Sequence, residues 1–385
     1  MITVESALAK IQEFLPSSWR SEATTAEALI ADRPYPPFNR VMMDGIAVSY
    51  EAFKQGKRQF PIMGVCAAGD PQKSLENLSS CMEVMTGTPM PMNADLVIQY
   101  EHLKIENGIA HIVQDQDRTQ HENVHIKGSD CAQGAVLLSE GHLLNGPHRG
   151  IAASLGYVSP KMHQAPRINI ISTGDELVPI HEVPLDHQIR RSNAHALEAS
   201  LRLHGFQDVV LSHLSDKEDV IESHYQENSS LFDVMIYSGG VSKGKFDYLP
   251  SMWNKMGVTE HFHGISQRPG KPLWFGMDEK NKTAVFGLPG NPVSSLVCLH
   301  RYFLKTRQRY VILDEEIIFK KDLTYFVPVK IHYRKDGSTT ATPLKVQNSG
   351  EFSALAGSDG FIELPKDQSV FKKGEAFAYF SWSPN

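Results

Sequence analysis

Between residues 167 and 309 the sequence alternates short apolar runs with helix-forming segments, and no other feature constrains the fold as much. Runs of strand length occupy residues 167–172, 208–214, 233–237 and 283–286. Strands that alternate with helices are typical of a mostly parallel sheet, because parallel neighbours need a crossover connection between them. We therefore predict a central α/β domain over residues 167–312.

Helix-start patterns follow three of these runs. Ser192 or Asn193 has the side chain of an N-cap, for a helix that ends at Gly205. Residues 215–218 (Ser-Asp-Lys-Glu) have the spacing of a capping box. The pair Asn291–Pro292 predicts a third helix start, because proline suits the first helical turn.

A glycine-bearing loop follows three of the predicted strands, at residues 172–177 (STGDEL), 238–244 (SGGVSKG) and 287–292 (GLPGNP). In open α/β sheets the carboxyl ends of the strands form the ligand crevice, and glycine lets backbone N–H groups approach an anion closely. The third loop also leads into a helix N-terminus, which favours negative charge. A sharp strand exit also requires glycine, so each loop alone is compatible with a structural role. Together they predict a crevice for a phosphorylated ligand.

Four carboxylates lie among these loops: Asp175, Glu176, Asp216 and Asp247. Acids beside a phosphate repel it unless a hard cation bridges them, and Mg²⁺ takes one or two carboxylates together with phosphate oxygens. A magnesium-dependent step is therefore expected, with Glu176, Asp216 and Asp247 as the metal ligands. The alternative is that Asp216 only caps a helix and Asp175 only closes a turn.

Two further patterns are disfavoured as functional motifs. Residues 239–245 match the P-loop spacing GxxxxGK, but Phe246 stands where a hydroxyl would hold Mg²⁺. Residues 121–125 match HExxH, but a zinc site requires a helix, and this segment resembles a strand that meets a turn. We interpret its histidines as ordinary surface residues.

The flanking segments have other patterns. Residues 1–45 predict an amphipathic helix and then an extended segment, and residues 46–130 predict a small β-rich domain. Beyond residue 313, alternation in residues 326–333 and an aromatic run at 377–382 predict a small β barrel or sheet. The apolar positions of the first helix recur at helical spacing at Val4, Ala7, Leu8, Ile11 and Leu15.

Composition excludes several classes of protein. The 385 residues predict two to four domains, and 41% hydrophobic against 21% charged residues predict a chain that is folded throughout. A net charge of −6 without a basic run argues against a nucleic-acid partner. The N-terminus lacks a signal-peptide pattern, no run has membrane-spanning length, and the four cysteines form no CxxC. We expect a cytoplasmic protein without a membrane partner.

Seven stretches, in order along the chain, resemble the molybdopterin molybdenumtransferase (MoeA) family, which includes the gephyrin E domain. They are PPFNRVMMDGIAV (36–48), MTGTPMPMNADLVIQYE (85–101), NVHIKGSD (123–130), STGDEL (172–177), SGGVSKGKFDY (238–248), RPGKP (268–272) and GLPGNPVS (287–294).

This resemblance implies an elongated homodimer of four domains. They are a split N-terminal linker and dimerisation domain (1–45 and 131–166), a small β-rich domain (46–130), a molybdopterin-binding α/β domain (167–312) and a C-terminal β-barrel domain (313–385). It also implies a transferase of molybdenum cofactor biosynthesis, which inserts molybdate into adenylated molybdopterin and releases AMP in a step that needs a divalent cation. A molybdopterin adenylyltransferase is a possible partner.

The resemblance assigns catalytic positions to Asp44, Thr86, Asp130, Glu176, Asp216 and Asp247. The substrate-binding residues expected from the loops and the resemblance are Thr173, Gly174, Ser238, Gly239, Gly240, Ser242, Arg268, Lys271, Pro289, Gly290, Asn291, Pro292 and Ser349.

Three positions depart from the family pattern. Arg268 replaces a lysine and keeps its positive charge. His125 stands where an arginine is common, which puts its oxyanion role in doubt because its charge depends on pH. Asn348 replaces the usual glycine beside Ser349.

Two other functions remain open from the sequence alone. The α/β domain also resembles the adenylyltransferase that acts one step earlier, although the extra domains favour metal insertion. A scaffold or clustering protein of the same fold is the second alternative. Assays with adenylated molybdopterin plus molybdate, and with molybdopterin plus ATP, separate the three.

Overall fold

The computed structural model describes residues 1–15, 19, 24–114, 116–241, 248–304, 306, 308–344 and 350–384. The chain forms two compact units. The first consists of Met1–Thr24 and Met162–Asn385, and the second of Thr25–Lys161. Within the described ranges, no helix has both the length and the apolar character that a bilayer crossing requires.

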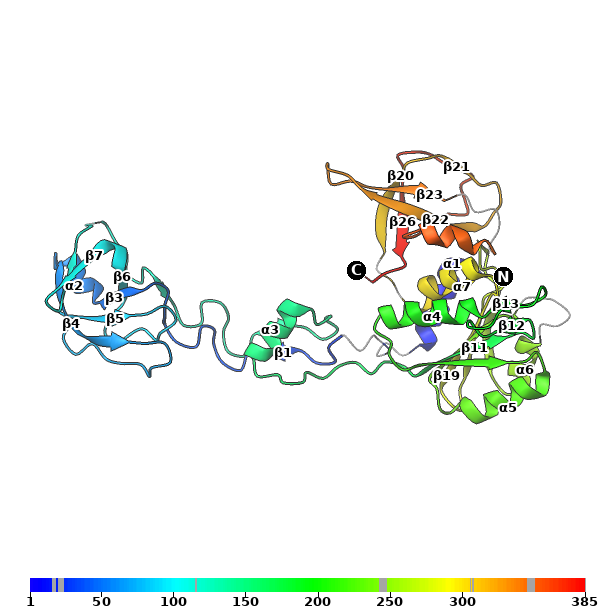
Figure 1. The fold of residues 1–385 in the computed structure, drawn as a ribbon, viewed down its shortest axis with the longest axis horizontal. Coiled ribbons are helices and arrows are strands. Elements are labelled where there is room, and N and C mark those ends of the chain that lie inside the picture. Colours follow the sequence, from blue (N-terminus) through cyan, green and yellow to red (C-terminus); the bar gives the residue numbers. More distant parts are fainter. Residues whose placement is uncertain are drawn as a thin grey trace. The chain divides into compact units, whose positions relative to one another are not determined.

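The first unit is built around a six-stranded sheet with the order β14-β11-β15-β19-β18-β16 (Figure 1). Its parallel strands are β11 (Ile168–Thr173), β14 (Val209–Leu214), β15 (Val234–Ser238) and β19 (Thr283–Leu288). β18 (Trp274–Asp278) is antiparallel to β19, and β16 (Thr259–His263) is antiparallel to β18. The predicted α/β domain is confirmed, and its two antiparallel strands make the sheet mixed. A separate pair, β12 (Leu177–Val178) and β13 (Ile189–Arg190), follows the first glycine loop.

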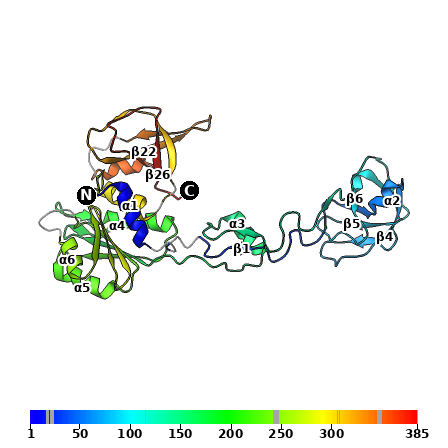
Figure 2. The ribbon, with the colours of Figure 1, turned by 180° about the vertical axis from the view of Figure 1, so that it is seen from behind.

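Helices cover both faces of this sheet (Figures 1 and 2). One face packs against α4 (Ser192–Leu203), α7 (Pro292–Cys298), the π-helical turn Leu299–Phe303 and α1 (Val4–Phe14). The other packs against α5 (Glu218–Asn228) and α6 (Leu249–Lys255). Burial of Val4, Ala7 and Ile11 confirms the amphipathic helix predicted at the N-terminus. β11, β15 and β19 are buried along their whole length, as expected for strands covered on both faces.

The C-terminal part of the first unit is a closed five-stranded barrel. Its strands are β20 (Arg309–Leu313), β22 (Thr324–Tyr333), β23 (Thr339–Pro343), β24 (Gly360–Leu364) and β26 (Ala376–Ser381). The barrel closes because β22 pairs with both β23 and β24. β17 (Gln267–Arg268) adds to β22, β21 (Ile317–Ile318) pairs with β25 (Val370–Phe371), and the 3-10 helix η3 spans Phe352–Gly357. The predicted C-terminal barrel is confirmed.

The second unit contains a six-stranded sheet with the order β6-β3-β5-β4-β8-β7. Its strands are β3 (Gly45–Val48), β4 (Gln59–Cys66), β5 (Cys81–Val84), β6 (Leu96–Gln99), β7 (Leu103–Glu106) and β8 (Ile109–Ile112), with helices α2 (Tyr50–Lys54) and η1 (Tyr100–His102). Asn107 and Gly108 have φ of 50° and 76°, which suits the tight turn between β7 and β8.

Two short pairs and a helix complete the second unit. β1 (Leu29–Ile30) pairs with β10 (Val136–Leu138), and β2 (Arg40–Val41) pairs with β9 (Val124–His125). Helix α3 spans Gly146–Ser154. Residues around 29 and 138 therefore lie side by side, although α1 belongs to the first unit. The four domain boundaries that we derived from the sequence remain predictions.

Two of the predicted helix caps are wrong. The N-cap of α4 is Arg191, so Ser192 is already the first helical residue and neither it nor Asn193 caps the helix. The N-cap of α5 is Lys217 and receives no side-chain hydrogen bond, so residues 215–218 do not form a capping box. In both cases the polar side chains beside the helix start are available for contacts with neighbouring loops.

Candidate substrate site

Four loops of the first unit meet at one edge of its sheet. Thr173 pairs with Leu214, Ser172 with Ser238 and Ser238 with Leu288, so the parallel strands β14, β11, β15 and β19 end at the same level. Trp274 pairs with Gly287, which brings the loop before β18 to this edge as well. The structure thus brings together the first and third predicted glycine loops, the described start of the second (residues 238–241) and the loop that contains Arg268 and Lys271.

The glycines of these loops have conformations or surroundings that exclude a side chain. Gly174, Gly239 and Gly240 have φ of 146°, 107° and 66°. A Cβ atom on Gly174 would lie 2.7 Å from a carboxylate oxygen of Glu176, and one on Gly240 would lie 2.9 Å from Cδ1 of Leu249. Gly174, Gly239 and Gly240 therefore favour glycine over any residue with a side chain.

Asn193 ties the second glycine loop to the third. Its Nδ2 donates to Oγ of Ser238 over 3.2 Å and to the carbonyl oxygen of Gly290 over 2.6 Å. The backbone N–H of Gly239 also donates to the carbonyl of Leu288 over 3.1 Å. Sequence reasoning missed this role, because it treated Asn193 only as a helix cap. The signal available was an amide side chain at the start of a helix that follows the first loop.

The hydroxyl of Thr173 faces the second glycine loop. Thr173 is 6% exposed, and its Oγ1 has no hydrogen-bond partner among the described residues. This oxygen lies 3.4–3.5 Å from the positions that Cβ atoms would take on Gly239 and Gly240. A buried hydroxyl without a partner is uncommon in proteins, and a bound polar ligand is one way to satisfy it.

Three carboxylates gather at the neighbouring loop ends. The backbone N–H of Asp216 donates to Oδ1 of Asp175 over 3.3 Å. Burial raises the pKa of Asp216, and the negative charges of Glu176 and Asp175 raise it further. Asp216 is not the cap of α5, so its alternative role as a cap is not supported. Asp175 does lie in a turn, in which the N–H of Leu177 donates to the carbonyl of Gly174 over 3.3 Å. Among the described residues, no three metal-ligating side chains form a complete cation site. Asp247, the third predicted ligand, lies outside the described residues.

The loop that contains Arg268 and Lys271 has a fixed conformation. Gly270 has φ of 89°, and Nε2 of the buried Gln267 donates to the carbonyl of Pro269 over 2.9 Å. Arg268 pairs with Tyr325 of the barrel in the β17–β22 ladder. That Arg268 and Lys271 bind an anion stays a prediction.

The three predicted catalytic residues of the second unit lie in two separate hydrogen-bonded pairs. The backbone N–H and the hydroxyl of Thr86 donate to Oδ1 of Asp44 over 2.6 and 2.8 Å, and these bonds hold the pKa of Asp44 below its usual range. Nε2 of His125 lies 2.7 Å from Oδ1 of Asp130. Val41 and its neighbour Arg40 contact segments next to both pairs. The side chain of Arg40 contacts His125, and the backbone N–H and carbonyl of Val41 form hydrogen bonds with residues 88 and 87.

The contact with Arg40 determines which ring nitrogen of His125 carries the proton. Its guanidinium lies 3.1 Å from Nδ1 of His125, and a guanidinium can only donate. Nδ1 therefore accepts, and Nε2 carries the proton toward Asp130. The guanidinium of Arg40 and the carboxylate of Asp130 thus contact opposite nitrogens of the His125 ring. Sequence reasoning missed Arg40, although it lies in the first of the seven stretches.

Three family models match successive parts of the chain. They are the MoeA N-terminal region (domains I and II) over residues 2–156, a probable molybdopterin binding domain over residues 169–308, and the MoeA C-terminal region (domain IV) over residues 310–382. The chain belongs to the MoeA family.

Curated members of the MoeA family cover nearly the full chain. The molybdopterin molybdenumtransferase of Synechocystis is 52% identical over 93% of this chain and 92% of its own length. That of Bacillus subtilis is 28% identical over 91% of this chain and 85% of its own. A solved molybdopterin biosynthesis MoeA protein from Pyrococcus horikosii is 25% identical, covers 100% of both chains and has a TM-score of 0.82.

Some predicted residues of this MoeA-family chain are not tested. Ser242 and Asp247 of the second loop and Ser349 of the barrel lie outside the described residues. Residues 243–245 of the P-loop-like spacing also lie outside the described residues. The HExxH-like segment is not helical, since His121 and Asn123 have φ of 66° and 58°. Its end forms β9, which runs into a turn at residues 127–128, so its interpretation as a strand that meets a turn is confirmed.

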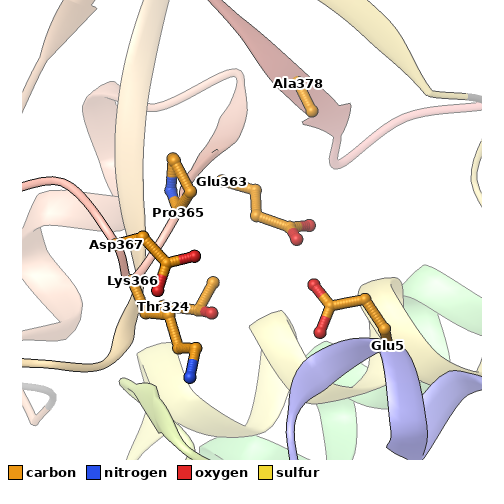
Figure 3. Close-up of a pocket in the computed structure, with 7 residues that line it drawn as sticks. All are labelled: Glu5, Thr324, Glu363, Pro365, Lys366, Asp367 and Ala378. Carbon is orange, nitrogen blue, oxygen red and sulfur yellow. The ribbon is translucent and has the colours of Figure 1, made fainter.

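A different cavity of this MoeA-family chain lies between α1 and the barrel and has a volume of about 250 Å³ (Figure 3). The carboxylates of Glu5, Glu363 and Asp367 line it, together with the single cation Lys366. Arg301 pairs with Glu363 over 2.7 Å. An anion would be repelled by this lining, so the crevice at the glycine loops is the better site for a phosphorylated substrate.

Proposed function

We propose that this chain inserts molybdate into adenylated molybdopterin and releases AMP. Membership of the MoeA family assigns it to molybdenum cofactor biosynthesis as a transferase. The observation that carries the substrate assignment is the crevice itself. Asn193 fastens two of the three glycine loops to each other, and the hydroxyl of Thr173 has no partner among the described residues. The loops therefore offer backbone N–H groups, and Thr173 a hydroxyl donor, to a phosphate.

Each part of the site has its own task in this proposal. The loops at residues 172–177, 238–244 and 287–292 hold the phosphate groups, and Arg268 and Lys271 add positive charge at the edge. In the second unit, Asp44 accepts from Thr86 and Asp130 accepts from His125. These carboxylates are fixed in position, so they are suited to orient oxygen atoms of a substrate by hydrogen bonding.

Mg²⁺ is proposed to bind at Glu176, Asp216 and Asp247. A hard cation fits the described part of this set. The negative charges of Glu176 and Asp175 raise the pKa of Asp216, and a bound cation would offset this repulsion. When bound, the ion would supply positive charge between the carboxylates and the phosphate. Mg²⁺ should therefore raise the melting temperature of the wild-type protein. This shift should disappear in Asp216→Asn and persist in Glu227→Gln, which removes an exposed charge of α5. An equal Mg²⁺ shift in all three proteins would argue against the assignment.

The direct test of function uses two reaction mixtures. Purified protein with adenylated molybdopterin, molybdate and Mg²⁺ should release AMP and yield a metal-containing pterin, which mass spectrometry and elemental analysis detect. Molybdopterin with ATP should give no product. ATP consumption in the second mixture would indicate the adenylyltransferase instead, and inactivity in both would leave a scaffold.

We also propose a cytoplasmic homodimer that receives its substrate from a molybdopterin adenylyltransferase. The four cysteines are free, which suits a reducing compartment. Light scattering should give about twice the chain mass of 43.0 kDa at working concentration. A mass of one chain would contradict the dimer.

A further inference from the structure

The short strands β2 and β9 of the second unit bring three polar side chains together. Their antiparallel register places Arg40 directly opposite His125. The loop after β9 is held by the segment before β2, because the backbone N–H of Asp130 donates to the carbonyl of Tyr35 over 2.9 Å. The two segments therefore fix where the side chains of Arg40, His125 and Asp130 begin.

These three side chains form a continuous hydrogen-bonded triad. Nη2 of Arg40 lies 3.1 Å from Nδ1 of His125, and Nε2 of His125 lies 2.7 Å from Oδ1 of Asp130. Side chains directly opposite each other in an antiparallel pair lie on the same face, so the first contact follows from the register. A guanidinium has donors only, which gives both bonds one direction. Arg40 donates to His125, and His125 donates to Asp130.

Only one oxygen of the Asp130 carboxylate is engaged. Oδ1 accepts from His125 and, over 3.4 Å, from Oγ of Ser129. Among the described residues, Oδ2 accepts no hydrogen bond. The side chain of Asp130 is 56% exposed, so Oδ2 is accessible to a ligand. The triad thus fixes one oxygen of the carboxylate and leaves the other free.

Stability alone does not account for this arrangement. Arg40 is exposed and Asp130 is more than half exposed, and charged pairs at such positions contribute little to folding. The contact with Arg40 instead selects one form of the His125 ring. Without a donor at Nδ1, the single ring proton could occupy either nitrogen. With the proton on Nδ1, the lone pair of Nε2 would face the carboxylate of Asp130 and repel it.

We propose that Arg40 is a positioning residue, which holds His125 in the tautomer that donates to Asp130. In this way it orients the Asp130 carboxylate, whose free oxygen accepts a hydrogen bond from the substrate. The inference rests on the proposed function, in which Asp130 orients the substrate, and it adds Arg40 as the residue that controls this orientation.

Four variants test the role of Arg40. Arg40→Met removes the donor at similar length, and Arg40→Lys keeps a group that can only donate. In Arg40→Met/His125→Arg the new guanidinium can donate to Asp130 directly. Arg33→Met is the matched control, because Arg33 is another exposed arginine of the second unit and lies over the ring of Tyr35.

AMP release measures the consequence for the reaction. Arg40→Met should keep the wild-type melting curve and release AMP about tenfold or more slowly, because small displacements of reacting or orienting groups have large effects on rate. Arg40→Lys and Arg33→Met should stay close to wild type, and the double variant should recover most of the rate that Arg40→Met loses. Affinity for AMP, titrated by calorimetry, should be the same in all variants, since the glycine loops belong to the first unit.

Nitrogen NMR of histidine-labelled protein measures the tautomer itself. The signals of His125 are identified among those of the 17 histidines by their absence in His125→Gln. Wild type and Arg40→Lys should show a protonated Nε2 and an unprotonated Nδ1, and Arg40→Met should show a mixture of both tautomers.

The outcomes separate the two proposals. An unchanged His125 tautomer in Arg40→Met, or a wild-type rate of AMP release, would overturn the positioning role and leave the proposed function standing. Loss of rate that neither Arg40→Lys nor the double variant avoids would also overturn it. Absence of AMP release from wild type would instead overturn the proposed function, and the tautomer spectra would then decide the hydrogen-bonded triad alone.

Discussion

Removing the hydroxyl of Thr173 should have different effects on stability and on ligand binding. It is buried and lacks a partner in the described structure, and an unsatisfied buried hydroxyl costs a folded protein about 1–3 kcal/mol. Thr173→Val keeps the shape and removes this hydroxyl. We expect the variant to be at least as stable as wild type in urea and to bind inorganic phosphate more weakly.

Thr283 provides the matched control for this prediction. Its hydroxyl donates to the carbonyls of Ser229 and Phe232, so Thr283→Val should lower the free energy of unfolding and leave phosphate affinity unchanged. A Thr173→Val protein that is destabilised as much as Thr283→Val, with normal phosphate affinity, would show that Thr173 is purely structural.

The contact between Arg40 and His125, beside Asp130, could be found only in the folded structure. The sequence indicated that His125 replaces an arginine, and it left the consequence open. The structure places the guanidinium of Arg40 on the far nitrogen of that ring. No local pattern links residues 40 and 125, because their contact arises from the pairing of β2 with β9.

Helix α4 depends on Asn193 for its connection to the glycine loops. Asn193→Ala removes two hydrogen bonds, which together contribute about 1–3 kcal/mol to stability. The loops at Ser238 and Gly290 would then lose their common anchor. We expect AMP release to slow by about tenfold or more, because small displacements of binding groups have large effects on rate.

Asn228 offers a comparison in the same fold. Its amide donates to the carbonyl of His224 near the end of α5, away from the loops. Asn228→Ala should lower stability and leave the rate of AMP release close to that of wild type. Equal rates for the Asn193 and Asn228 variants would refute the anchoring role.

The same helix shows why some elements were predictable and others were not. The parallel core strands contain buried β-branched residues, so their positions along the chain were predicted from local sequence, whereas their order in the sheet was not predicted. The caps at Ser192 and at residues 215–218 were predicted wrongly because a capping residue is also a good partner for a neighbouring loop, and Asn193 contacts Ser238 instead. Helix α3 was not predicted, since Gly146, Pro147 and Gly150 are more typical of turns. Its cap is the side chain of Asn145.

Contact between the α/β domain and the barrel includes a buried histidine. Nε2 of His300 lies 3.2 Å from Oγ of Ser200 on α4, and its ring packs on Trp382 and faces His204. Burial, followed by the nearby His204, lowers the pKa of His300 to about 3 from an ordinary value of 6.5. The unfolded chain therefore binds a proton that the folded protein excludes between these values.

This difference makes stability depend on pH. Above pH 6.5, His300 is neutral in both the folded and the unfolded chain, so it does not reduce the free energy of unfolding. As pH falls from 6.5 toward 3, only the unfolded chain takes up the proton, and the free energy of unfolding falls by at most about 1.4 kcal/mol per pH unit for this one group. His300→Gln should show a smaller loss of unfolding free energy in urea between pH 7 and pH 5, while His204 continues to contribute. Parallel pH profiles for wild type and His300→Gln would rule out this origin of acid sensitivity.

The path of the chain has a consequence for synthesis. Helix α1 is made before the second unit, yet its partners in the hydrophobic core, such as Ile265 and Tyr302, are made only after the whole second unit. Domains generally fold as units while the chain emerges from the ribosome. The second unit can therefore fold on the ribosome while the apolar side chains of Val4, Ala7 and Ile11 in α1 remain exposed to solvent. We therefore expect that α1 of a nascent chain is accessible to a chaperone that recognises an amphipathic helix until translation passes the π-helical turn at Leu299–Phe303.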